Sequence, residues 1–95
     1  MALQIITVTD LKGNTIPDRG RTQEVNLQFS VETDSPLQRF MLRVSKSVLG
    51  QGATDGQSRA IIEIDVTHLP KAMHSFNVAR SDSEFSEGYL IELIS

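Results

Sequence analysis

Strict alternation of apolar and polar side chains between residues 23 and 33 is the feature that most limits the fold of this chain. Every second position is apolar there, and the positions between are polar, which is the period of a strand with one buried and one solvated face. A helix would need apolar residues three and four positions apart. The segment therefore predicts a half-buried antiparallel strand.

The same period recurs along the rest of the sequence. Further strands are expected at residues 3–9, 39–46, 59–66, 74–80 and 89–94, and a weaker one at 47–49 would be a seventh. Clusters of Asp, Gly, Asn and Pro separate them. Apolar residues occupy both faces of the first segment, so its register stays open. We predict an all-β, two-sheet antiparallel sandwich of about seven strands, rather than a closed barrel of more evenly matched strands.

The inward faces of these strands predict the hydrophobic core. Its expected members are Val25, Leu27, Phe29, Val31, Phe40, Leu42, Val44, Ile62, Ile64, Val66, Phe76, Val78, Ile91 and Leu93.

Composition excludes several classes of protein. Ninety-five residues have room for one domain, and the absence of cysteine excludes disulfides, thiolate metal sites and a thiol nucleophile. A net charge of −3 argues against a nucleic-acid partner, because phosphate binding needs a basic surface. No apolar run approaches the roughly 20 residues of a membrane span, and the first residues lack the pattern of a signal peptide. We expect no membrane insertion.

Two histidines and several turn aspartates are the candidates for chemistry. His74 and Ser75 are adjacent on an expected strand, so they point to opposite faces and make a poor base and nucleophile. No third metal ligand has a convincing spacing from His68 and His74. We expect no catalytic residue, no metal and no cofactor. Calcium at the loop tips is a disfavoured alternative, because turn aspartates usually accept backbone hydrogen bonds; these are Asp10, Asp18, Asp34 and Asp55.

Two groups of residues follow a familiar order of strands and glycine-bearing turns. The first comprises Ile6-Thr7-Val8-Thr9-Asp10, Gly13-Asn14, Ile16-Pro17-Asp18, Gly20 and Thr22. The second comprises Leu49-Gly50, Ala53, Asp55-Gly56, Val66, Leu69, His74-Ser75-Phe76, Val78-Ala79 and Tyr89-Leu90-Ile91. On these residues the chain resembles a bacterial immunoglobulin-like domain of the type repeated in large surface proteins and adhesins.

The resemblance implies one immunoglobulin-like domain over residues 1–95, with a non-catalytic structural or adhesive role. It also implies an extracellular or cell-surface location, as one unit of a longer protein. Two alternatives stay open: an accessory ligand- or carbohydrate-binding sandwich attached to a secreted enzyme, and a particle-decorating domain. One Tyr and no Trp make an aromatic shelf for sugars unfavourable.

A protein-contact face follows from the immunoglobulin-like arrangement. In that arrangement the third, sixth and seventh strands share one sheet, so their outward residues should gather into a mixed apolar and charged surface. The alternatives are scattered surface residues or a last strand in the opposite register. The expected partner is protein, either a neighbouring domain or a copy of the same chain. The predicted residues are Arg39, Met41, Arg43, Ala79, Leu90, Glu92 and Ile94.

Overall fold

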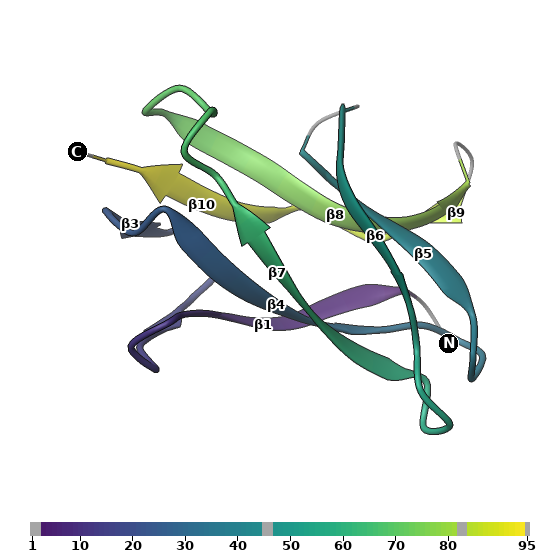
Figure 1. Cartoon of the computed structure of the whole chain (residues 1–95). Coiled ribbons are helices and arrows are strands. Elements are labelled where there is room, and N and C mark those ends of the chain that lie inside the picture. Colours follow the sequence, from purple (N-terminus) through teal and green to yellow (C-terminus); the bar gives the residue numbers. More distant parts are fainter. Residues whose placement is uncertain (1–2, 45–46, 82–83, 95) are drawn as a thin grey trace.

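The computed structural model of the chain describes residues 3–44, 47–81 and 84–94, which fold into two stacked sheets without a helix (Figure 1). The first sheet has the order β2-β1-β4-β7, formed by β2 (Thr15–Ile16), β1 (Gln4–Asp10), β4 (Asn26–Glu32) and β7 (Arg59–Asp65). The second has the order β3-β10-β8-β5-β6, formed by β3 (Gly20–Thr22), β10 (Tyr89–Leu93), β8 (Met73–Ser81), β5 (Arg39–Val44) and β6 (Ser47–Ala53); β9 (Glu84–Phe85) pairs with β8.

The predicted two-sheet sandwich is confirmed. The weak segment at residues 47–49 is the start of β6, and β5, β8 and β10 share one sheet as expected. One pairing departs from the antiparallel rule: β3 runs parallel to β10, with Gly20 opposite Ile91. The sequence predicts that the strand corresponding to β5 continues to Lys46. Residues 45 and 46 lie outside the described part of the chain.

The opening strand shows why its register could not be assigned from the pattern. The pairing of β1 with β4 shifts between Ile5 and Thr7, so the alternation is interrupted by an extra residue. Beyond this bulge Val8 is fully buried, whereas Ile6 is 43% exposed. Apolar residues on both sides of the strand are the signature of that bulge.

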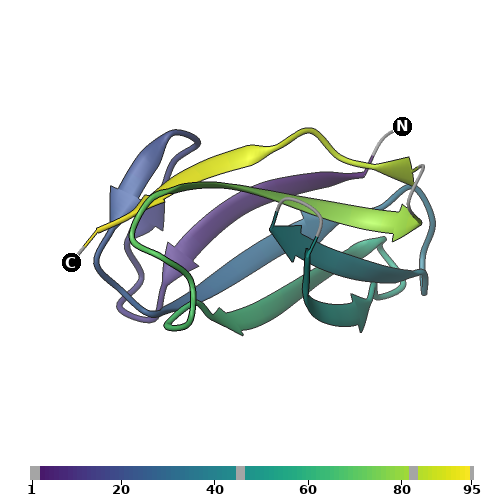
Figure 2. The same ribbon diagram turned by 90° about the horizontal axis from the view of Figure 1, so that it is seen from above.

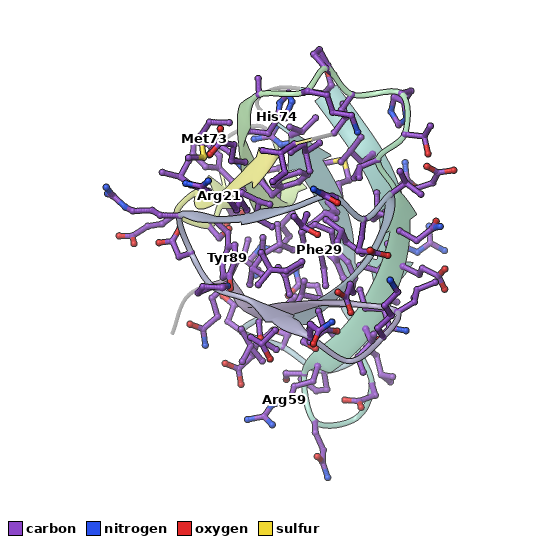
Figure 3. All side chains as sticks on the ribbon, turned by 90° about the vertical axis from the view of Figure 1, so that its left-hand side faces the viewer. Arg21, Phe29, Arg59, Met73, His74 and Tyr89 are labelled. Carbon is purple, nitrogen blue, oxygen red and sulfur yellow. The ribbon has the colours of Figure 1, made fainter. Side chains whose placement is uncertain are left out.

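The core lies between the sheets and is centred on two aromatic rings. Phe29 of β4 and Phe76 of β8 are both fully buried, and their ring centroids are 5.2 Å apart with the planes tilted by 44°. Figure 3 shows Phe29 in the middle of the space between the sheets. Most predicted core residues are buried: Leu27, Phe29, Val31, Phe40, Leu42, Val44, Ile64, Val66, Phe76, Val78, Ile91 and Leu93.

Two predicted core positions are corrected. Val25 is 37% exposed, because the chain bends at this residue and the regular alternation of β4 begins only at Asn26. Ile62 is only half-buried and packs against the core from the side where β6 approaches β7. A Cβ atom at Gly50 would come within 3.2 Å of the Ile62 Cδ1 atom, so the missing side chain allows this approach.

The start of the first strand, β1, and the end of the last strand, β10, lie at opposite ends of the molecule. Gln4 at the start of β1 is opposite Glu32, the last residue of β4. Leu93 at the end of β10 is opposite Thr22, which lies just before β4 begins. The Cα atoms extend over 37 × 27 × 19 Å, and the N and C labels lie at opposite sides of Figure 2.

Truncation of either central ring should strongly destabilise the domain. Phe29→Ala or Phe76→Ala should each lower the free energy of unfolding by about 3–5 kcal/mol, through lost transfer energy and the cavity left behind. The double variant should lose less than the sum, by about 0.5–1.5 kcal/mol, because the two rings contact each other. Urea unfolding measures these values, with the exposed Val48→Ala as control. A cost below about 1 kcal/mol at both rings would overturn the assigned core.

Candidate contact face

The outer surface of the second sheet holds the residues that the sequence predicts for protein contact. Leu90 lies opposite Ser75, and Met41 lies opposite Ala79, so these side chains share the face directed away from the core. Leu90 is half-buried, whereas its neighbour Ile91 is fully buried. The predicted register of the last strand is therefore confirmed. Arg39 is exposed, and the half-buried members are Met41, Leu90, Glu92 and Ile94.

Ala79 and Arg43 do not contribute to the surface as predicted. Ala79 is fully buried and Arg43 is 8% exposed. The reason is β9, which places Phe85 opposite Ala79 between the two last strands that the sequence predicts, at residues 74–80 and 89–94. The Arg43 guanidinium carbon lies 5.3 Å from the centroid of the Phe85 ring, and Arg43 Nε donates to Asn77 Oδ1 at 3.4 Å. The charge of Arg43 is thus engaged within the domain.

Three apolar residues of this surface escape the sequence prediction. Phe85 is 53% exposed, and Met73 and Val48 are each 48% exposed. Register places Met73 opposite Glu92, and Val48 opposite Arg43. Alternation would have placed Met73 on this face if the strand expected at residues 74–80 had been started one residue earlier. Phe85 could not be found in this way, because β9 is too short to show an alternation. We define the contact face as Met41, Val48, Met73, Phe85, Leu90 and Ile94.

A groove beside this face marks the break between β9 and β10. Ser86 is buried there, and its Oγ accepts the N–H of Val78 at 3.0 Å, in place of a backbone carbonyl. The chain then leaves the sheet before β10 begins. The resulting depression of about 480 Å³ is lined partly by the acidic side chains Asp18 and Glu87. Tyr89 also lines it, but its hydroxyl donates to the Ile16 carbonyl at 2.6 Å.

The histidines and the serine considered for chemistry have different surroundings. The His74 ring makes a 2.8 Å hydrogen bond through Nε2 to the Pro70 carbonyl, and its plane is tilted by 64° to that of the Phe76 ring, with the centroids 6.3 Å apart. Ser75 belongs to the opposite, outer face, and His68 is exposed in the preceding turn. Within residues 3–44, 47–81 and 84–94, no group of three or more His, Cys, Asp or Glu is arranged to hold a metal ion.

Asp10 and Asp55 accept hydrogen bonds from the backbone of their own turns, as predicted. Asp10 Oδ1 accepts the N–H groups of Lys12 at 2.8 Å and Asn14 at 2.9 Å. Asp55 Oδ1 accepts those of Gln57 at 2.8 Å and Arg59 at 3.2 Å. The backbone hydrogen bond from Asn14 lowers the pKa of Asp10, and the one from Gln57 lowers the pKa of Asp55. A minor role for calcium stays a prediction.

Two further aspartates join distant segments. Asp18 Oδ1 accepts the N–H of Leu90 at 2.8 Å, which fixes the start of β10. Asp34 pairs with Arg80, whose guanidinium also reaches Glu84.

Comparison of the chain with protein-family models, curated proteins and solved structures finds no match. The described residues also contain no helix of the length and apolarity that crossing a membrane requires. The class established by the fold is therefore an all-β sandwich, and the resemblance to bacterial immunoglobulin-like domains stays a prediction.

The lowered pKa values of Asp10 and Asp55 should make the free energy of unfolding depend on pH in the acidic range. Above the ordinary carboxyl pKa of 3.8, Asp10 and Asp55 are ionised in both states and their turn hydrogen bonds stabilise the fold fully. Below it the unfolded state binds protons first, so the free energy of unfolding falls until the lower folded-state pKa is passed. Asp10→Asn should be less stable at neutral pH and lose less stability on acidification. Urea unfolding from about pH 5 to about pH 2 measures this; an unchanged pH slope would contradict it.

Exposure on the contact face predicts a contrast between neighbouring residues of β10. Leu90→Ser combined with Ile94→Ser should cost only about 1–2 kcal/mol in total, because both side chains are half-exposed on the outer face. Ile91→Ser, which places a hydroxyl in the core, should cost at least about 3 kcal/mol. Circular dichroism and urea unfolding distinguish the two. Unfolding of the domain by the outer pair would mean that the face does not exist.

Proposed function

We propose that this chain is a non-catalytic structural or adhesive β-sandwich module and forms one unit of a longer bacterial extracellular protein. The observation that carries the proposal is the placement of β1 and β10, which begin and finish at opposite ends of the molecule (Figure 2). A unit in a linear array must receive the chain at one end and pass it on at the other. The resemblance to repeated surface domains supports the same role.

The contact face supports a protein partner for this module. Single exposed apolar residues are ordinary, but a group on one sheet is typical of protein-contact surfaces. Phe85, Met73 and Val48 are each about half exposed, and they lie on the same side of the sheet as Met41 and Leu90. The exposed Arg39 and the half-buried Glu92 provide charges of both signs for orienting a partner.

A single chain that contains two copies of the domain, joined end to end, tests whether the units form a linear array. The two-copy chain should be extended, with a maximum dimension of roughly twice the 37 Å long axis, because each unit passes the chain on at its far end. Small-angle X-ray scattering measures this dimension. The same two-copy chain carrying Leu90→Ser and Ile94→Ser in each unit serves as control and should be equally extended.

Two outcomes would contradict parts of the proposal. A compact wild-type pair that becomes extended in the Leu90→Ser/Ile94→Ser control would contradict the linear array and would instead assign the contact face to packing between neighbouring units. Selective binding of the single domain to one carbohydrate on a glycan array would instead favour the accessory carbohydrate-binding alternative.

A further inference from the structure

The large apolar side chains that are exposed outside the strands lie at the two ends of the molecule. The described part of the chain has three of them: Leu37, Leu11 and Val25. Leu37 belongs to the turn between β4 and β5, at the end where β1 begins, which we call the head (Figure 1). Leu11 follows β1 and Val25 precedes β4, at the end where β10 finishes, which we call the tail.

Leu37 has a backbone conformation that is unfavourable for leucine. Its φ of 55° lies in the left-handed region, which glycine and asparagine tolerate and other residues rarely adopt. Its side chain is also 77% exposed, the largest exposed fraction of any large apolar residue in the described part of the chain. Backbone strain of this kind is common where a protein binds a ligand or a partner. A strained and exposed leucine is therefore a candidate contact residue.

Two buried threonines hold the turn in this conformation. The hydroxyl groups of Thr33 and Thr54 both donate to the Ser35 carbonyl, at 2.7 and 3.0 Å. The Leu37 N–H donates to the Asp55 carbonyl at 3.1 Å, which joins the turn to the connection between β6 and β7. The Leu37 side chain is thus presented on a braced support. A partner that covers it would lose little conformational entropy in ordering the turn.

The tail carries its two apolar side chains on segments that an ion pair joins. Lys12 Nζ lies 3.4 Å from Glu24 Oε2, and these residues are the chain neighbours of Leu11 and Val25. The ion pair therefore connects the turn after β1 to the segment before β4. Leu11 is 52% exposed and Val25 is 37% exposed, so the tail offers an apolar surface of its own.

The charges at the two ends are complementary. Asp34 and Glu84 at the head both pair with Arg80, so two carboxylates share one guanidinium. Arg80 also donates to Gln38 Oε1 at 3.2 Å, which places this acidic group beside the turn of Leu37. The side chain of Lys12 at the tail is 72% exposed. A group with excess negative charge at one end and an exposed lysine at the other favour contact between the ends of two copies.

We propose that Leu37 of one copy packs against Leu11 and Val25 of the preceding copy, so that the joint between successive units is a defined contact. Lys12 of the preceding copy then faces the carboxylates beside Leu37. The contact is heterologous, because each unit uses its head for one neighbour and its tail for the other. This inference rests on the proposed linear array and adds the residues that orient neighbouring units.

A chain of two directly joined copies brings the required surfaces together. Three residues separate Ile94 of the first unit from Leu3 of the second. The Ile94 N–H donates to the Thr22 carbonyl at 2.9 Å, and Leu3 is buried, so each of these residues is held by its own domain. Four residue steps span at most about 14 Å. The tail of the first unit and the head of the second therefore meet at high effective concentration.

Disulfide formation between introduced cysteines tests this contact, because the chain contains no cysteine of its own. In the two-copy chain, Val25→Cys in the first unit should cross-link to Leu37→Cys in the second. The rate should be at least about tenfold higher than for Val25→Cys with Gln57→Cys, because a defined contact raises the effective concentration of one pair only. Gln57 is exposed in the turn between β6 and β7 at the same head. The exchanged pair, Leu37→Cys in the first unit and Val25→Cys in the second, should form no intramolecular disulfide.

Leu37→Asn distinguishes the contact from a loss of fold. Asparagine tolerates the left-handed conformation, so the urea midpoint of the single domain should not fall. In the second unit of the two-copy chain this substitution should abolish the common orientation of the two units, which residual dipolar couplings measure when one unit at a time is isotopically labelled. In the first unit, whose head faces no neighbour, it should leave that orientation unchanged.

Three results would overturn the proposed contact: equal cross-linking rates for the Leu37 and Gln57 pairs, independent orientation of the wild-type units, or an equal effect of Leu37→Asn in both units. Small-angle scattering of the same chain separates this failure from failure of the array. An extended pair with independently oriented units would overturn the contact and leave the linear array standing. A compact pair would contradict both.

Discussion

Phe29 and Phe76 form the contact that holds the two sheets in a single arrangement. β4 lies between β1 and β7, and β8 lies between β10 and β5, so each ring comes from a strand paired on both sides. Because successive side chains alternate, burial of these rings also directs Leu27 and Val78 inward. Backbone pairing with these two strands then determines which residues of each neighbouring strand face the core. The outward placement of Met41 and Leu90 is thus a consequence of core packing.

Polar side chains complete the sandwich where backbone pairing stops. Tyr89 donates its hydroxyl to the Ile16 carbonyl, and Asp18 accepts the Leu90 N–H, so the β2–β3 segment is tied to β10. Burial raises the pKa of Tyr89 above its ordinary value of 10.0, so the hydroxyl stays a donor to a higher pH than that of an exposed tyrosine. Ser86 similarly replaces a backbone acceptor for Val78. Such side chains provide hydrogen-bond partners for buried backbone groups at the points where the chain leaves the sheets.

Sequence alternation could predict the strand faces because a period of two directly reports which side a residue occupies. It succeeded for the buried partners of Phe29 and for the register of β10. It failed where pairing between distant segments decides exposure: Ala79 has the pattern of a surface residue, but Phe85 lies opposite it. A strand as short as β9 has no measurable period, and the parallel pairing of β3 follows from chain routing. The residues exposed on the outer side of the second sheet were consequently predicted only in part, and their role in protein contact stays a prediction.

The proposed contact face lies largely on central strands, whose backbone groups are already paired within the sheet. A protein partner at this face would therefore be selected by side chains alone. Backbone pairing at a sheet edge fixes the direction of the added strand, whereas contact through side chains of central strands imposes no such direction. The contact face is thus compatible with neighbouring units of either orientation.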